Sequence, residues 1–137
     1  MTTKEKEKKK ETDADKLLKK ATGKIGSSYK YGGTGPNEFD CSGFVYWCHA
    51  QIGITVPRTS SDQYDQGSDA SGEKGSLVFF KKDGKINHVG ICDGDGNMIN
   101  AQSSGVKKVS ISSVKSSWGM GEKCGYKKFI DWFLNNL

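Results

Sequence analysis

A helix is predicted to begin within the sequence Asp40-Cys41-Ser42-Gly43-Phe44-Val45-Tyr46-Trp47-Cys48. Asp40 is a favourable N-cap residue, and an apolar stripe at helical spacing follows it, made of Phe44, Val45, Trp47 and Cys48. Cys41 therefore falls in the first turn of this helix. Unpaired backbone N–H groups and the helix dipole create a positive end there.

Cys41 is predicted to be chemically reactive because of this position. A positive helix end lowers the pKa of a thiol and so favours the thiolate. The preceding loop, residues 31–38, contains several glycines, which leave room for a substrate backbone to approach. From this stretch alone, a small buried cysteine at the start of a helix is an equally good interpretation.

The length of the chain, 137 residues, is enough for one domain with one core. The formal net charge is +5, but the first twenty residues hold eight lysines against five acidic residues, so the rest is only slightly basic. We interpret residues 1–12 as a disordered, solvated tail and residues 13–137 as the domain. The domain has no basic stripe with interleaved aromatic residues, so no nucleic-acid partner is expected.

The sequence contains no apolar run of roughly 18 residues, so no membrane span is expected. The N-terminal residues also lack the apolar segment of a signal peptide. Either the protein has none, or this chain is a domain excised from a longer one. The positive net charge would suit an anionic surface such as a bacterial cell wall.

The four cysteines, at positions 41, 48, 92 and 124, form no C-x-x-C pair and are predicted to be free thiols. A zinc site built from Cys41, Cys48, His49 and Cys92 would match no common ligand spacing. We therefore expect neither a metal ion nor a cofactor.

The order of predicted elements is helices first and strands afterwards, which is typical of an α+β fold with N-terminal helices packed on an antiparallel sheet. Apolar residues at helical spacing predict the helices, and apolar or alternating runs predict the strands. Helices are expected from residue 13 to about 25, from 41 to about 52 and over 62–64, with a polar loop at 67–75. Strands are expected at 77–80, 86–92, 97–101, 106–111 and 125–130.

A hairpin is predicted over residues 86–101, with its turn centred on Gly94. In that register His88 faces Asn100 directly. Side chains alternate along a strand, so a shared core face would be formed by Val89, Ile91, Ile99 and Ala101. His88 and Asn100 would then be neighbours on the opposite face.

A thiol, a histidine and a polar residue that orients the histidine together make a cysteine peptidase site. Cys41, His88 and Asn100 supply this set from three predicted elements. His49 is the weaker candidate, since it lies on the same helix as Cys41, about 12 Å further along the axis. The alternative is that His88 is an exposed strand histidine and Asn100 a solvent-facing polar residue.

Six blocks of the sequence resemble the NlpC family of cell-wall cysteine peptidases, a papain-like family. They are Tyr-Lys-Tyr-Gly-Gly-Thr-Gly (29–35), Asp-Cys-Ser-Gly-Phe-Val (40–45), Val-Pro-Arg-Thr-Ser (56–60), Gly-Ser-Leu-Val-Phe-Phe (75–80), Asn-His-Val-Gly-Ile (87–91) and Met-Ile-Asn-Ala (98–101). The resemblance runs from about residue 13 to 130. It implies a small α+β domain, with the nucleophile helix packed on an antiparallel sheet.

The resemblance implies Cys41 as nucleophile, His88 as base and acid, and Asn100 as the orienting residue, a position where the family commonly has His. Tyr31 would match the family tyrosine near the nucleophile, as a hydroxyl donor or as a packed aromatic. Asp40 and Ser42 match a pair that in some relatives binds the free amine of a stem peptide's L-Ala, although Asp40 is equally explained as a helix cap. Arg58, outside this set, is expected to be structural or solvated.

The function implied is that of a peptidoglycan hydrolase, a thiol endopeptidase that cuts amide bonds in stem peptides, with γ-D-glutamyl-diamino acid as the expected bond. One alternative is a CHAP-like amidase that cuts the bond between muramic acid and L-Ala, or a cross-bridge endopeptidase. A second alternative is a non-catalytic wall-binding module. The expected setting is outside the cell or in the cell wall of a bacterium, or in a phage lysin or an exported toxin, with the protein acting as a monomer.

Overall fold

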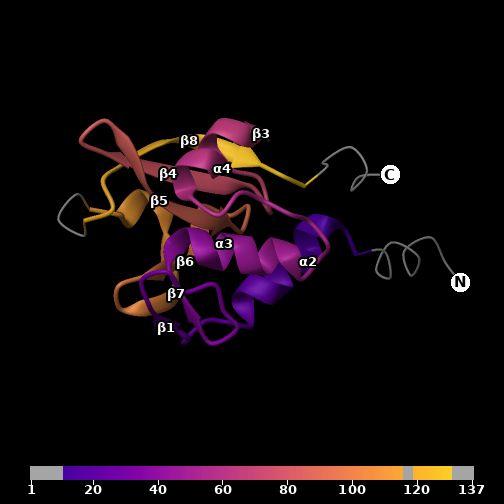
Figure 1. Cartoon of the computed structure of the whole chain (residues 1–137). Coiled ribbons are helices and arrows are strands. Elements are labelled where there is room, and N and C mark those ends of the chain that lie inside the picture. Colours follow the sequence, from indigo (N-terminus) through magenta and orange to yellow (C-terminus); the bar gives the residue numbers. More distant parts are fainter. Residues whose placement is uncertain (1–10, 116–118, 131–137) are drawn as a thin grey trace, which may run out of the picture.

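The structure is a computed structural model that describes residues 11–115 and 119–130. Its elements combine helices with one large sheet and a small two-stranded sheet (Figure 1). In chain order they are α2 (Asp13–Thr22), β1 (Ser28–Tyr29), β2 (Glu38–Phe39), α3 (Cys41–Ala50), α4 (Ser60–Gln66), β3 (Ser68–Asp69), β4 (Leu77–Lys82), β5 (Lys85–Cys92), β6 (Asn97–Gln102), β7 (Gly105–Ser110), the 3-10 turn η1 (Ile111–Ser113) and β8 (Glu122–Lys128). The predicted α+β class is confirmed.

The first helix, α2, begins with a capping box in which Thr12 and Asp15 satisfy each other's backbone N–H groups. Thr12, the last residue of the predicted tail, is therefore part of the helix start. Residues 1–10 of that predicted tail lie outside the described residues. The helix ends at Thr22, so Ile25 does not extend its apolar face and is 45% exposed.

The six-stranded sheet has the strand order β3-β8-β4-β5-β6-β7, and every neighbouring pair is antiparallel. The middle of this order is the meander that the sequence predicts. The last strand, β8, starts three residues earlier than predicted and pairs with β4. Within the predicted polar loop at 67–75, β3 forms a two-residue edge strand against β8.

The hairpin between β5 and β6 differs from its predicted register by two residues. Ile91 pairs with Ile99, so the turn centres on Asp95 and not on Gly94. The Asp93 carboxylate causes this shift, because its Oδ1 accepts the backbone N–H groups of both Asp95 and Asn97. A shift of two residues keeps every side chain on its predicted face.

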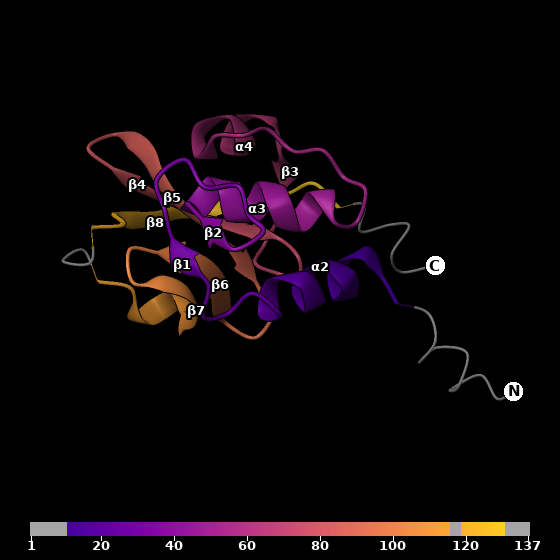
Figure 2. The same ribbon diagram turned by 60° about the horizontal axis from the view of Figure 1, so that its bottom comes forward.

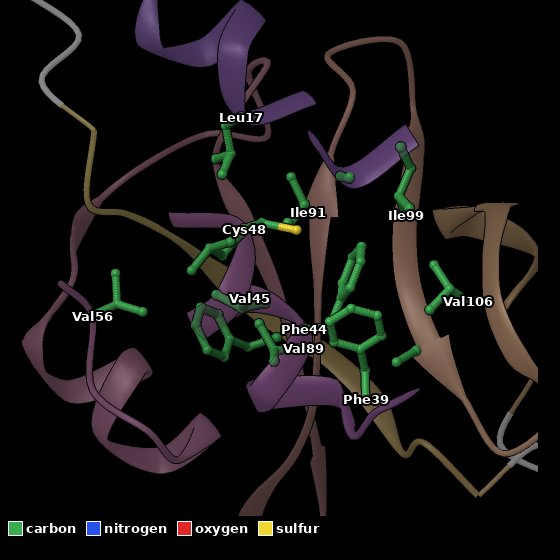
Figure 3. Packing of buried hydrophobic residues seen from close by; sticks show 14 of the residues in the cluster. Leu17, Phe39, Phe44, Val45, Cys48, Val56, Val89, Ile91, Ile99 and Val106 are labelled. Carbon is green, nitrogen blue, oxygen red and sulfur yellow. The ribbon is translucent and has the colours of Figure 1, made fainter. Parts of the chain in front are cut away.

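The helices cover one face of the sheet and build the main core there. In Figure 2 α4, α3 and α2 lie one above another, and both outer helices contact α3. In Figure 3 the side chains of Val45 and Cys48 from α3 lie in the same cluster as Ile91 of the sheet. The predicted core face of the hairpin is buried in this cluster at Val89, Ile91, Ile99 and Ala101.

The opposite face of the sheet is also covered, by a second apolar cluster made of Val78, Phe80, Cys92, Met98 and Met120. His88 belongs to this side, since its ring lies 5.9 Å from the ring of Phe80. Consequently His88 is only 7% exposed and Asn100 is fully buried. The alternative of two solvent-facing polar residues is wrong.

No helix within the described part of the chain is both long and apolar enough to cross a membrane.

Candidate active site

The start of α3 is held by contacts on both sides of Cys41. Asp40 caps the helix, and its Oδ1 accepts the backbone N–H of Gly43 at 2.6 Å. The loop before the helix folds back onto this turn, where the Asp40 N–H donates to the Gly33 carbonyl at 3.0 Å. A Cβ at Gly43 would collide with that same carbonyl, so only glycine permits the loop to approach this closely.

One pocket brings the predicted thiol and histidine together. It has a volume of about 260 Å³ and opens beside the start of α3, which lies next to β1 and β2 in Figure 2. Its lining comes from β1, α3, β5, the end of β6 and the segment before β8, namely Tyr29, Cys41, Asn87, His88, Ala101, Gln102, Ser103, Gly119 and Met120. Cys41 and His88 thus face a single space in which one substrate bond could contact both.

Asn100 lies behind His88 and determines which ring nitrogen of neutral His88 carries the proton. His88 Nε2 and Asn100 Oδ1 are 2.7 Å apart. The Asn100 amide nitrogen donates to Gln102 Oε1 at 3.3 Å and to the Lys107 carbonyl at 3.2 Å. Since the amide NH₂ is directed at two acceptors, its oxygen faces the ring and Nε2 must be the donor. The basic nitrogen of neutral His88 is therefore Nδ1.

The actual register of the hairpin explains how this contact forms. Asn100 lies beside Gly90, where an added Cβ would be 3.1 Å from the Asn100 Cβ. His88 is the diagonal neighbour of Asn100 on the same face. Glycine at position 90 leaves the space through which the Asn100 side chain turns toward the ring.

Burial sets the charge state of the free site. It raises the pKa of the Cys41 thiol, as does the neighbouring Asp40 carboxylate, and backbone N–H bonds from Val89, Ser42 and Cys41 itself act in the other direction. Burial also lowers the pKa of His88, against the effect of the Asn100 hydrogen bond. The predicted lowering of the thiol pKa by the helix end is therefore wrong: loss of solvation outweighs it, and both shifts favour the neutral forms.

Arg58 connects the two residues that flank Cys41. Its Nη2 is 2.7 Å from Asp40 Oδ2, and its Nη1 donates to Asp40 Oδ1 at 3.2 Å and to Ser42 Oγ at 2.8 Å. The Gly32 N–H also donates to Asp40 Oδ2. The proposed substrate-binding role of Asp40 and Ser42 stays a prediction, and in the structure both residues are engaged by Arg58.

Tyr29, and not Tyr31, is the tyrosine that the structure brings to the pocket. Tyr31 is 90% exposed and is not part of the lining, and its proposed role stays a prediction. Burial raises the pKa of the Tyr29 hydroxyl, and the neighbouring Cys41 acts in the same direction. Strand alternation would place the two rings on the same face, so no sequence signal separates Tyr29 from Tyr31.

The other candidate ligands and nucleophiles lie away from this pocket. His49 is fully buried, and its Nδ1 is 2.7 Å from the Val45 carbonyl in the same helix. Cys48 is buried in the main core, and Cys92 in the second cluster. Among the described residues, no group of three or more His, Cys, Asp or Glu side chains is placed to hold a metal ion.

A larger pocket, of about 460 Å³, lies between the turn joining β4 and β5 and the start of β8. Its lining includes Lys81, Lys82, Lys123 and Cys124 but no histidine. A thiol there would have no base beside it, so volume alone does not identify the site.

Comparisons with known proteins identify the family of this chain. The family model of the NlpC/P60 family matches residues 26–123, and the chain belongs to this family. It is 46% identical over 106 residues to a probable endopeptidase p60 of Listeria seeligeri, a match that covers 75% of this chain and 20% of that protein. It is 40% identical over 104 residues to the bifunctional muramidase/DL-endopeptidase CwlT of Bacillus subtilis, over 71% of this chain and 32% of that protein. The chain thus spans a fifth to a third of these relatives.

Solved structures show the same fold. An NlpC/P60 family protein from Bacillus cereus superposes with a TM-score of 0.78 at 31% identity, over 86% of this chain and 40% of that one. The peptidoglycan hydrolase RipB of Mycobacterium tuberculosis superposes with a TM-score of 0.70 at 27% identity, over 88% of this chain and 66% of that one.

Proposed function

We propose that the protein is a peptidoglycan hydrolase, a cysteine endopeptidase that cuts amide bonds in cell-wall stem peptides. The observation that carries this proposal is the single pocket lined by Cys41 and His88, with His88 hydrogen-bonded to Asn100. Relatives named as endopeptidases and as a peptidoglycan hydrolase support the substrate class. Action outside the cell or in the wall follows from that substrate.

The reaction begins with proton transfer from the Cys41 thiol to Nδ1 of His88. The sulfur then attacks the carbonyl carbon of the scissile amide, and the backbone N–H of Cys41 stabilises the oxyanion at the helix start. Tyr29 lines the same pocket, and its hydroxyl would be a second donor for this oxygen. His88 returns the proton to the leaving amine, and water, activated by His88, hydrolyses the thioester.

Asn100 acts on this sequence through His88. Its oxygen accepts the Nε2 proton, which keeps Nδ1 free to take the thiol proton and stabilises the imidazolium that forms. Three residues from α3, β5 and β6 would thus form a Cys-His-Asn triad. The main core beneath α3 and the β5–β6 pair holds them rigidly.

The bond we propose is γ-D-glutamyl-diamino acid. The name DL-endopeptidase, carried by one relative, supports a bond between residues of opposite configuration. An amidase that released stem peptides from muramic acid, or an enzyme that cut cross-bridges, would give different product masses.

Digestion of purified sacculi, followed by mass spectrometry of the soluble products, tests the proposal. We expect new free amines on the diamino acid with the wild-type chain and none with Cys41→Ala or His88→Ala. Asn100→Ala should lower kcat roughly 10- to 100-fold with little change in KM, because it disturbs the orientation of the base. As a matched control, Asn37→Ala at an exposed loop position should cleave like the wild type. Equal cleavage by Cys41→Ala would disprove the proposal.

A further inference from the structure

Arg58 is the only arginine in a chain that otherwise uses lysine for its basic residues. Its guanidinium contacts Asp40 with two nitrogens and Ser42 with one of them, on either side of Cys41. A lysine ammonium could not make this forked contact, since it presents one nitrogen where the guanidinium presents two. The use of arginine at this one place therefore points to a geometric requirement beside the nucleophile.

The backbone that carries Arg58 is itself fixed to the first turn of α3. Gln63 of α4 is fully buried, and its amide nitrogen donates to the Pro57 carbonyl at 2.8 Å and to the Ser42 carbonyl at 3.1 Å. Arg58 thus reaches the helix start from a segment that is already attached to it. The Asp40 side chain is 13% exposed and that of Arg58 is 36% exposed, so the carboxylate is more shielded from solvent than the guanidinium.

We propose that Arg58 is a positioning residue for Cys41: its guanidinium fixes both flanking residues and offsets part of the charge of the Asp40 carboxylate beside the thiol. A bare carboxylate next to Cys41 would oppose formation of the thiolate by Coulomb repulsion. The charged and titratable groups around the thiol are Asp40 with Arg58, Tyr29 from β1 and His88 from β5. Of these groups, Asp40 and Arg58 are the two that are ionised in the free site, and they form an ion pair.

This inference rests on the proposed role of Cys41, but its test measures the thiol and needs no substrate. The rate of alkylation of Cys41 by iodoacetamide is followed against pH by mass spectrometry of the peptide that contains it. Arg58→Gln should raise the midpoint by roughly one pH unit, so that alkylation below the midpoint slows about tenfold. Asp40→Asn should shift the midpoint in the opposite direction. The double variant should lie between the two single variants.

Two further variants separate this effect from folding and from net charge. Arg58→Lys keeps the charge but loses the fork, and its midpoint should fall between those of the wild type and Arg58→Gln, which gives a test even if Arg58→Gln does not fold. Lys20→Gln removes one exposed charge from α2 and should leave the midpoint unchanged. A wild-type midpoint in both Arg58 variants, or a double variant that matches Arg58→Gln, would overturn the inference. Cleavage of sacculi by the wild-type chain would stand in either case.

Discussion

At the scale of single residues, the neutral thiol and imidazole of the free site predict how hydrolysis depends on pH. Burial lowers the pKa of His88 below 6.5 and raises that of Cys41 above 9.0. In the active form Cys41 and His88 together hold one titratable proton. The pair takes up a second proton only below the pKa of His88, and it loses the first proton only above the pKa of Cys41. We therefore expect a broad bell for kcat/KM, with its acid limb below pH 6.5 and its alkaline limb above pH 9.0.

The thiolate absorbance in the ultraviolet provides the complementary measurement. At neutral pH the wild type and Cys41→Ser should show the same absorbance per molecule, because a neutral thiol contributes no thiolate band. An excess in the wild type, or an alkaline limb below pH 9.0, would mean that the pair is already ionised before substrate binds.

His49 predicts a separate effect of pH, on stability. Burial lowers its pKa from 6.5 to about 4, and its Nε2 has no hydrogen-bond partner. The unfolded chain therefore binds a proton near pH 6.5 that the folded chain takes up only near pH 4, so stability falls as the pH drops through this interval. The full effect is roughly 3 kcal/mol.

Urea unfolding of the wild type and of His49→Gln at a series of pH values measures this contribution. The loss between pH 6.5 and 4 should be smaller in His49→Gln, since glutamine does not titrate. Carboxylates with lowered pKa, such as Asp15 and Asp93, lose their contribution at acid pH in both proteins alike. Parallel curves for the two proteins would contradict the prediction.

The residues predicted from sequence were those whose position follows from chain order and periodicity. Cys41, His88 and Asn100 come from separate elements, and alternation along the strands was enough to place the last two on one face. The sign of the thiol pKa shift was not accessible, because it depends on how much solvent the folded chain removes. Neither was the choice of Tyr29 over Tyr31, which depends on the path of a loop.

At the scale of elements, the junction between α3 and its preceding loop depends on Gly43. An added methyl group there would collide with the Gly33 carbonyl and press on the Asp40 carboxylate. We expect Gly43→Ala to lower the free energy of unfolding by about 1–3 kcal/mol and to reduce hydrolysis, since the displaced loop packs against the helix start that holds Asp40 and Cys41.

Gly23 provides the matched control for this prediction, because it ends α2 in a right-handed helical conformation and an added Cβ would come no closer than 3.4 Å to the Lys19 carbonyl. Gly23→Ala should therefore keep or slightly raise stability in urea unfolding. If the two alanine variants unfolded alike, close approach would not be the reason for glycine at position 43.

The elements themselves followed from local patterns, and their errors came from contacts that those patterns do not record. Helix starts at α2 and α3 agree with the sequence because capping residues act locally, whereas α4 starts at Ser60, two residues before the predicted 62–64. The β5–β6 register was wrong by two residues, since the carboxylate of Asp93 closes a longer turn than the glycines suggested. The place of β8 beside β4 is a long-range pairing that no local signal records.

At the scale of the whole molecule, the charge is unevenly divided along the chain, and this predicts a role for the N-terminal residues in wall binding. Residues 1–10 contain five lysines and two glutamates, so they hold +3 of the formal +5. Stem peptides carry carboxylates, and attraction between exposed charges is screened by salt. We expect deletion of residues 1–10 to weaken co-sedimentation with sacculi several-fold at low ionic strength and to have little effect at high ionic strength.

Hydrolysis of a short soluble muropeptide should be unchanged by this deletion, because the pocket at Cys41 and His88 lies in the described domain. Replacing Lys4, Lys6, Lys8, Lys9 and Lys10 with glutamine keeps the length of the segment and should weaken binding like the deletion. If the glutamine variant bound as the wild type does while the deletion did not, the segment would act through its length or sequence and not through its charge. Equal binding by all three proteins would confine wall recognition to the domain.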